Sequence, residues 1–327
     1  MINNVRIYEA TGYNPYVNLA IEKYLLDSVM PGECILYLWQ NQNTVVIGRN
    51  QNSFVECRTS LLEEEGGHLA RRLSGGGAVF HDLGNLNFTF LISSDDYDVD
   101  RQLSVIQRAC ALAGITAEKS GRNDLLANGA KFSGNAFYQS KDKAYHHGTL
   151  LLNVDMDKLQ RYLSPSKAKL EAKGVASVRS RVINLQELAP ELSIATMKQY
   201  MRQALEDVFG HTAESVTLTD DAWATITATA QLYGSWEYLH GTPLPFSFAC
   251  ETRFSWGQIR LELEAKSGMI TGAKVYSDAM DWTLPAAIEQ ALTGCAFRLE
   301  DMETALRQAL PPMEASDVIG LLAQQDL

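Results

Sequence analysis

Hydrophobic and polar residues alternate along the first fifty positions in patterns that predict short strands and one helix. Residues 5–10 (VRIYEA) have the pattern of a strand. Asn14 precedes a proline, as a helix N-cap precedes the first helical position, and the apolar periodicity continues to about Val29. Residues 33–40 and 44–48 are rich in β-branched and aromatic side chains around a polar turn. These two runs predict a β-hairpin.

The next hundred residues predict a strand, a helix and an antiparallel meander. Residues 85–93 alternate like a half-buried strand, and residues 98–113 have helical periodicity. Residues 121–155 contain short alternating runs separated by Asn-Gly, Ser-Gly and Lys-Asp turns, which is typical of an antiparallel meander. A short helix is predicted over 156–163. Residues 166–184 are basic, contain Ser and Gly, and predict a loop.

The chain of 327 residues is too long for one comfortable core and predicts a large domain followed by a small one. Helices are expected over about 193–209 and 221–233. The stretch GTPLPFS contains two prolines and a glycine, so we place the linker at about 241–247. The expected domains are therefore residues 1–242 and residues 248–327, the second an α+β unit of strands and closing helices.

Composition and charge exclude several classes of protein. Hydrophobic residues make up 46% of the chain and charged residues 20%, as in ordinary globular proteins. The net charge of −11 disfavours a general nucleic-acid binder. No stretch reaches the length of a membrane-spanning helix, and the first ten residues have no apolar segment typical of a signal peptide. Five scattered cysteines suggest reduced thiols. We therefore expect a cytoplasmic protein without nucleic-acid or membrane partners.

The stretch RRLSGGGAVFHDLGN, residues 71–85, joins two arginines to three glycines. Glycine permits positive φ values and close approach of another molecule to the backbone. Arg71 and Arg72 supply fixed charge and fork-shaped donors for phosphate or carboxylate. An anion-binding loop is one interpretation. A flexible connection with two solvated arginines is the other, and this stretch alone does not decide between them.

The stretch GRNDLLANGAKFSGNAF, residues 121–137, places Lys131 between an Asn-Gly turn and Ser-Gly. A lysine there could bridge anionic oxygens. Arg122, Asn123 and Asp124 add a cation, an amide and a carboxylate, and the carboxylate of Asp124 could bind Mg²⁺ beside a phosphate. The alternative is a polar hairpin with an exposed lysine.

Other familiar chemistries are not supported by the sequence. His146 and His147 are adjacent in a predicted strand, so they point to opposite faces and cannot chelate one metal together. No zinc-type spacing, GxSxG, GxGxxG or P-loop occurs, and neither glycine-rich stretch contains a cysteine. The basic segment with Lys173, Ser177 and Arg179 could be a solvated loop or a lid over an anionic ligand.

In order, the motifs ARRLSGGGAVFHDLGNLNFTF, GRNDL, KFSGNAF, HHGTLLLN and KLEAKGVASVRSRVINL resemble the lipoate–protein ligase A family. RFSWGQIRLELEAKSGMITGAKVYSDAMD resembles that family's small C-terminal domain. The resemblance implies an α+β fold of the biotin/lipoate ligase type. Its catalytic domain has a large mixed, mostly antiparallel sheet with flanking helices, and a small C-terminal α+β domain follows.

The resemblance also implies the reaction. Lipoate, in its (R) form, and MgATP would form lipoyl-AMP and pyrophosphate. The lipoyl group would then pass to a lysine of an apo-lipoyl domain, either in a 2-oxoacid dehydrogenase E2 subunit or in the glycine-cleavage H protein. ATP and Mg²⁺ act as co-substrate and activator, and no tightly bound metal or prosthetic group is expected.

The resemblance further assigns residues. Lys131 would be catalytic and would contact both lipoate and the adenylate phosphate. The other residues expected to bind ATP or lipoyl-AMP are Arg71, Gly76, Gly77, Ala78 and Val79, of which Arg71 and Gly76 would also bind lipoate. Secondary candidates are Arg72, Ser74, Gly75, Asn123, Asp124, Ser133, His147, Lys173, Ser177 and Arg179.

Two alternatives remain open. One is a lipoyl or octanoyl transferase of the same fold, which takes its acyl group from a protein-bound donor, needs no ATP and in some cases uses a cysteine. The other is a non-catalytic protein that senses lipoate or a nucleotide. The second domain and the absence of a motif cysteine favour the ligase.

Overall fold

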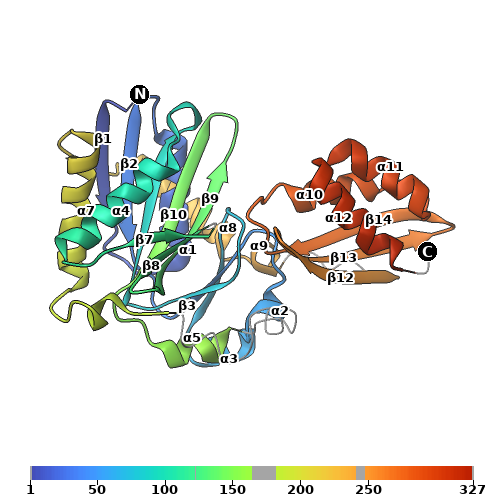
Figure 1. The fold of residues 1–327 in the computed structure, drawn as a ribbon, viewed down its shortest axis with the longest axis horizontal. Coiled ribbons are helices and arrows are strands. Elements are labelled where there is room, and N and C mark those ends of the chain that lie inside the picture. Colours follow the sequence, from blue (N-terminus) through green and yellow to red (C-terminus); the bar gives the residue numbers. More distant parts are fainter. Residues whose placement is uncertain (1, 122, 164–181, 241–246, 326–327) are drawn as a thin grey trace.

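The structure, a computed structural model, describes residues 2–121, 123–163, 182–240 and 247–325. A large sheet with helices on both faces is followed by a smaller α+β unit (Figure 1). This arrangement confirms the predicted α+β fold class.

Eight strands of the described residues form the large sheet. The two pairs β11–β1 and β1–β2 are parallel and all other neighbours are antiparallel, so the sheet is mixed and mostly antiparallel. In spatial order the strands are β11 (Glu214–Ser215), β1 (Asn4–Glu9), β2 (Glu33–Trp39), β6 (Asn85–Ser93), β10 (Lys143–Leu151), β9 (Ala130–Gln139), β8 (Asp124–Ala127) and β7 (Glu118–Ser120).

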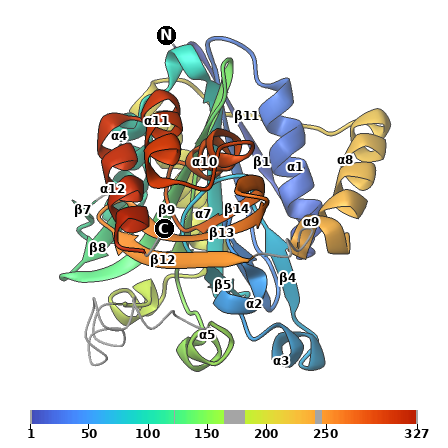
Figure 2. The same ribbon diagram turned by 90° about the vertical axis from the view of Figure 1, so that its right-hand side faces the viewer.

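Helices cover both faces of this sheet because the central strands are apolar on both sides. Leu36 of β2 packs in one core with α4 (Val99–Leu112) and α7 (Ile194–Phe209). Its neighbour Tyr37 packs in a second core with α1 (Pro15–Ser28) and α8 (Asp220–Tyr233). Figure 2 shows α1 and α8 side by side, away from α4.

Helix ends follow the sequence signals. The Asn14 side chain accepts hydrogen bonds from the backbone N–H groups of Tyr16 and Val17, at 2.9 and 3.3 Å, and proline takes the first position of α1. Ser193 caps α7 in the same way, and Gly210 ends that helix with a φ of 73°. The helices predicted over 15–29, 98–113 and 193–209 are confirmed.

The predicted hairpin of residues 33–40 and 44–48 is wrong. All seven residues of β2 are buried, and its two edges bind β1 and β6. β3 (Thr44–Ile47) instead lies in a separate three-stranded sheet, between β4 (His68–Arg71) and β5 (Val79–His81). Because both edges of β2 are already paired with other strands, it cannot also pair with β3, the next strand in the sequence.

The meander predicted over 121–155 is confirmed by β8, β9 and β10. The turn between β8 and β9 is Asn128-Gly129, with φ of 49° and 76°. Positive φ at both central residues is the geometry of a tight type I′ hairpin, which Asn-Gly favours.

Short helices surround the three-stranded sheet and close a third core that includes Ile47, Phe80 and Tyr162. These helices are α2 (Ser53–Glu56), α3 (Thr59–Glu64), α5 (Met156–Tyr162) and α9 (Trp236–His240). The helix predicted over 156–163 is thereby confirmed. The core fixes the strand β4 that leads into the glycine-rich stretch.

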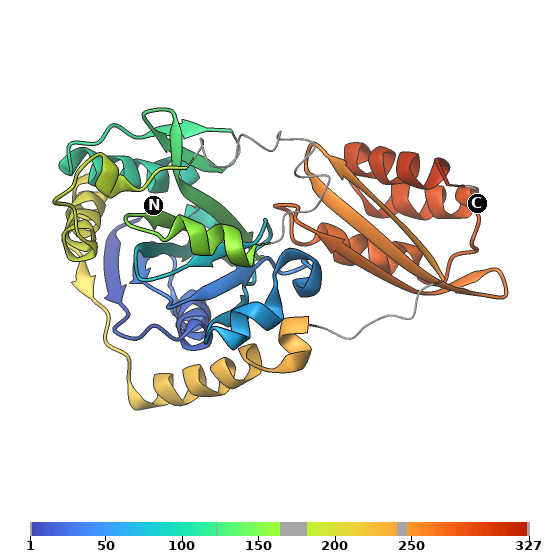
Figure 3. The same ribbon diagram turned by 90° about the horizontal axis from the view of Figure 1, so that it is seen from below.

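Figure 3 shows the strands and helices of the C-terminal unit. Residues between Cys250 and Leu322 form a core of its own. Its antiparallel sheet and helices are β12 (Phe248–Phe254), β13 (Gly257–Lys266), β14 (Met269–Ser277), α10 (Leu284–Leu292), α11 (Leu299–Ala309) and α12 (Pro312–Ala323). The linker residues 241–246 lie outside the described part of the chain, so the domain boundary stays a prediction.

Candidate active site

The glycine-rich stretch connects β4 to β5 at the edge of the large unit. Gly76 has a φ of +87°, which side chains other than glycine rarely adopt. A Cβ at this residue would lie 3.1 Å from a terminal nitrogen of Arg72 and 3.3 Å from the sulfur of Met280. The backbone conformation therefore requires glycine, and a side chain here would also crowd Arg72 and Met280.

The two arginines of the stretch differ in their surroundings. Arg71 is half-buried, and burial lowers its pKa to about 10. Its guanidinium nitrogens donate to backbone carbonyls that end α9 and form the turn after β3. These carbonyls belong to Gly48, Arg49, Gln51, Tyr238 and Leu239. Its contact with a nucleotide stays a prediction, since in this structure its donors bind the backbone.

Arg72 is fully internal and holds the glycine-rich stretch in shape. It is 6% exposed, and burial lowers its pKa to about 10. Its nitrogens donate to the carbonyl of Gly75 at 2.8 and 3.1 Å, to that of Gly77 at 2.7 Å and to that of Val46 at 3.1 Å. The charge is thus surrounded by carbonyl oxygens.

A chain of buried polar groups continues from Arg72 into the sheet. The Arg72 Nε donates to Ser74 Oγ at 3.1 Å, and Ser74 Oγ lies 2.8 Å from His147 Nε2. His147 Nδ1 lies 2.8 Å from a carboxylate oxygen of Glu22. Because Nδ1 faces a carboxylate, we assign a proton to this nitrogen. Secondary candidates Arg72, Ser74 and His147 are therefore brought together.

Glu22 was not predicted from the sequence. It is 2% exposed and also accepts a hydrogen bond from Thr89 Oγ1 at 2.7 Å, which in turn accepts from Trp39 Nε1 at 3.1 Å. The available signal was a carboxylate three residues after Leu19 and four before Leu26, on the apolar face of α1. An acid there requires a buried partner.

The two predicted faces of the His146–His147 pair are confirmed. His147 faces α1 through Glu22, whereas His146 contacts Gln102 of α4 and Asn135. Burial lowers the pKa values of His146 and His81 to about 3, assisted by nearby His147, and for His81 also by Arg72. Both side chains are therefore neutral in the folded protein.

These two histidines predict a pH dependence of stability. Below pH 6.5 the unfolded chain binds protons that the folded protein excludes, so stability falls as the pH drops from about 7 towards 3. Each histidine should lower the free energy of unfolding by about 2 kcal/mol between pH 6.5 and 5. Urea unfolding of wild type and His146→Gln at pH 7 and 5 measures this. Between pH 7 and 5, the free energy of unfolding should fall less in His146→Gln than in the wild type. In His211→Gln, which replaces an exposed histidine, it should fall by the same amount as in the wild type.

Lys131 lies near the start of β9 and forms an ion pair with Asp124 of β8. Its Nζ is 2.6 Å from the Asp124 carboxylate, and both side chains are about one third exposed, at 35% and 36%. The backbone carbonyl of Lys131 accepts from Ile183 at 2.9 Å. The ammonium is therefore accessible while its backbone is fixed.

Asn123 and Ser133 occupy the same hairpin with different roles. Asn123 exchanges hydrogen bonds with Asn135, side chain to backbone in both directions, at 2.9 and 3.0 Å. Ser133 is buried, and its hydroxyl has no partner among the described residues. In this structure Asn123 fixes the entry to β8.

A loop of the small unit contacts the glycine-rich stretch directly. The Gly76 N–H donates to the carbonyl of Ala279 at 3.0 Å, and a Cβ at Gly75 would lie only 2.3 Å from that oxygen. Trp282 stacks on Tyr138 at 5.0 Å and lies under the guanidinium of Arg49 at 4.4 Å. At Gly75 the close approach predicted for a ligand is made by this loop.

Met280 of this loop joins the two predicted halves of the site. Its sulfur lies 4.0 Å from the Asn123 amide and 3.3 Å from the position of a Cβ on Gly76. The glycine-rich stretch and the β8–β9 hairpin therefore face each other across one methionine side chain.

The remaining predicted site residues lie either beneath the glycine-rich stretch or outside the described residues. Ala78 and Val79 are half-buried and pack against the cores beneath the loop. Lys173, Ser177 and Arg179 lie outside the described residues. Among the residues described, no group of three or more His, Cys, Asp or Glu could hold a metal ion, and no helix is long and apolar enough to cross a membrane.

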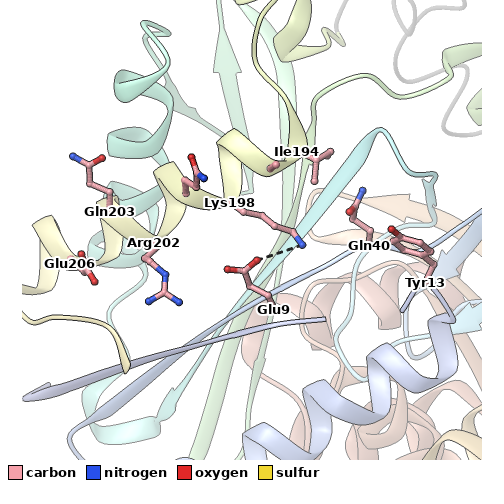
Figure 4. A pocket seen from close by; sticks show the side chains of 10 residues that line it. Glu9, Tyr13, Gln40, Ile194, Lys198, Arg202, Gln203 and Glu206 are labelled. Carbon is pink, nitrogen blue, oxygen red and sulfur yellow. Dashed lines mark ion pairs between the residues drawn. The ribbon is translucent and has the colours of Figure 1, made fainter. Parts of the chain in front are cut away.

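A separate pocket lies on the side of α7 (Figure 4). It has a volume of 690 Å³ and contains the ion pair between Lys198 and Glu9, at 3.7 Å. None of the predicted site residues lines it. The site predicted at the glycine-rich stretch and the β8–β9 hairpin is therefore distinct from this pocket.

Solved structures resemble this chain over most of its length. LipL1 of P. falciparum, solved in complex with lipoate, is 25% identical, with a TM-score of 0.86 over 98% of this chain and 100% of that one. A bi-partite lipoate protein ligase of Thermoplasma acidophilum is 25% identical, with a TM-score of 0.66 over 75% and 99%. A lipoate-protein ligase A bound with ATP is 25% identical, with a TM-score of 0.64 over 74% and 99%.

Family models match both units. The model of the bacterial lipoate protein ligase C-terminus matches residues 244–322. The model of the lipoyl protein ligase A/B catalytic domain matches residues 14–206, more than half of the chain. The glycine-rich stretch and Lys131 both lie within that match. The chain therefore belongs to the lipoate–protein ligase family and is a ligase.

Proposed function

We propose that this protein activates lipoate with MgATP to lipoyl-AMP, releasing pyrophosphate, and then transfers the lipoyl group to a lysine of an acceptor protein. The observation that carries the proposal is the match of both the catalytic and the C-terminal family models to one chain. The likeness to proteins solved with lipoate and with ATP supports the two substrates.

The charge arrangement suits the first step. The lipoate carboxylate must attack the α-phosphate of ATP, so two anions have to meet, and catalysis consists mainly of positioning and charge neutralisation. Lys131 offers an accessible ammonium, paired with Asp124. The residue before Asp124, Asn123, meets Met280 opposite Gly76 of the glycine-rich stretch. In this proposal the ammonium leaves Asp124 in part and holds the carboxylate and phosphate oxygens together.

Mg²⁺ belongs in this proposal to the nucleotide substrate. Mg²⁺ is commonly bound by one or two carboxylates together with substrate phosphates. Asp124 is the one predicted carboxylate of the site, and it is already paired with Lys131. The described residues thus fit a metal that arrives with ATP better than a resident ion.

A transferase that forms an acyl-cysteine receives no support from the thiols. Burial raises the pKa of Cys34, Cys57 and Cys110 to about 12 and that of Cys250 to about 11, and it also raises the pKa of Cys295. Thiols in such surroundings are poor nucleophiles. The ligase proposal needs no thiol.

For the second step we propose apo-lipoyl domains of E2 subunits and the H protein as acceptors. The Thermoplasma acidophilum ligase was solved as part of a system with its E2 lipoyl domain, which supports the first class. The loop around Met280 fills the space between Gly76 and Asn123, so we propose that it withdraws when an adenylate binds.

Lipoate-dependent exchange of labelled pyrophosphate into ATP tests the activation step, with purified protein, Mg²⁺ and no acceptor. We expect exchange that requires lipoate. A folded protein that shows none, but accepts an acyl group from octanoyl carrier protein, would refute the ligase proposal in favour of the transferase.

A further inference from the structure

The direction of the Lys131 side chain depends on an irregularity of β9. The ladder between β8 and β9 pairs Asp124 with Gly134 and Leu125 with Ser133, and then Leu126 with Lys131. Phe132 has no partner on β8 and is therefore the extra residue of a β-bulge.

The bulge brings Lys131 and Gly134 onto the same face. In a regular strand, residues three apart point to opposite faces. Here one of the intervening residues is extra, and a Cβ on Gly134 would lie 3.1 Å from the Lys131 Nζ and 3.2 Å from its Cε. The end of the lysine side chain therefore lies over the α-carbon of Gly134.

Because Gly134 has no side chain, the end of the Lys131 side chain can occupy the space above its α-carbon. Asp124, the ion-pair partner, stands directly opposite Gly134 in the ladder, so the ammonium crosses the glycine to reach the carboxylate. The φ of Gly134 is not in the left-handed region, so the backbone conformation does not itself require glycine. Among the described residues, the next atom that such a Cβ would approach is Thr149 Oγ1, at 4.0 Å.

We infer that Gly134, together with the bulge at Phe132, is a positioning residue that aims the Lys131 ammonium at the reacting oxygens. The inference rests on the proposed function, in which that ammonium holds lipoate and the adenylate phosphate. A methyl group at residue 134 would push the ammonium aside without disturbing the backbone, because the atom it meets is the end of a flexible side chain.

The test is a double-mutant cycle with Gly134→Ala and Lys131→Ala. Wild type and Gly134→Ala are compared by lipoate-dependent pyrophosphate exchange and by thermal unfolding. We expect kcat to fall about 10-fold or more, since displacements near 1 Å can cost 10²-fold, with a nearly unchanged unfolding midpoint. Gly12→Ala is the control, because Gly12 is exposed and, apart from its chain neighbours, no described residue has an atom within 4 Å of its Cβ position.

Binding of a lipoyl-sulfamoyl-adenosine analogue, measured by calorimetry, completes the cycle. Gly134→Ala should weaken binding in the wild-type background and have no further effect in Lys131→Ala, because the displaced ammonium is already gone. Equal losses in both backgrounds, or unchanged kcat in Gly134→Ala, would overturn the inference. If Gly134→Ala is itself unstable, its effect on the unfolding midpoint should disappear in the Lys131→Ala background. Equal shifts of the midpoint in both backgrounds would overturn the inference.

A failure of the proposed function is distinguishable from a failure of this inference. If wild-type protein shows no exchange, the proposed function is wrong whatever residue 134 does. If the wild type exchanges normally and Gly134→Ala does so equally, only the role of Gly134 is wrong.

Discussion

Lys131→Ala is expected to reduce lipoate-dependent pyrophosphate exchange by about 10³-fold while the protein remains folded. Removal of one preorganised charge-stabilising group commonly costs 10²–10³ in kcat, about 3–4 kcal/mol. Here the ammonium is the predicted neutraliser of two anions. The stability loss should stay below about 1 kcal/mol, because the pair with Asp124 is about one third exposed.

Lys119→Ala is the matched control for this variant. Lys119 lies on β7, beside β8, and its half-exposed side chain pairs with Asp100 of α4 at 2.7 Å instead of with a predicted site residue. Its removal should leave exchange unchanged. Wild-type exchange in Lys131→Ala, or unfolding of that variant, would contradict the proposed role. A protein that only senses lipoate or a nucleotide would show no exchange even as wild type.

Arg72→Ala is expected to cause a large loss of stability, about 3–5 kcal/mol. The side chain is 6% exposed and its donors satisfy the carbonyls of Val46, Gly75 and Gly77. Its removal takes these hydrogen bonds from the three oxygens and removes the cation from the chain that leads through Ser74 to Glu22. Urea unfolding measures the loss.

Two comparisons make the Arg72 prediction specific. Arg108→Ala removes a half-exposed partner of Asp207 and should cost less than 1 kcal/mol. Arg72→Lys keeps a positive charge but cannot reach three carbonyls with a planar fork, so it should recover only a part of the loss. A cost in Arg72→Ala as small as that in Arg108→Ala would show that the buried network is not important for stability.

The two arginines of the glycine-rich stretch show where sequence interpretation stops. Their residue type and position in the sequence predict that both bind an anion. The structure separates them: Arg71 donates to backbone carbonyls of α9 and the turn after β3, whereas Arg72 holds the glycine-rich stretch itself. The acceptors of Arg71 lie twenty or more residues away in the sequence, and Arg72 also reaches Val46, 26 residues away, so no local pattern reports these contacts.

The buried network of Glu22, Ser74 and His147 likewise depends on distant segments. Glu22, Ser74 and His147 lie on α1, the glycine-rich stretch and β10, and meet only because the sheet brings these elements together. His147 was a candidate through the family resemblance, but its partner Glu22 was not. A carboxylate on the apolar face of a predicted helix shows that a partner must exist, and it does not show which.

Local physics determined much of this protein in advance. The caps at Asn14 and Ser193, the Asn128-Gly129 turn and the meander rest on backbone preferences of a few residues, so the sequence predicts them directly. The ordered motifs also identified the family, and with it the large mixed sheet. The glycine-rich stretch and Lys131 were named as candidates for the same reason.

Tertiary structure decided the rest, because it depends on which distant segments become neighbours. The sequence of residues 33–39 and 44–47 predicts a hairpin, but β2 pairs with β1 and β6 and not with β3. All seven residues of β2 are buried, so the strand needs a partner at both edges. The contact of Met280 with Gly76 and the aim of Lys131 across Gly134 depend on side-chain distances of a few ångströms. Residue types and spacing fix the local conformations, but only the packed chain fixes such distances.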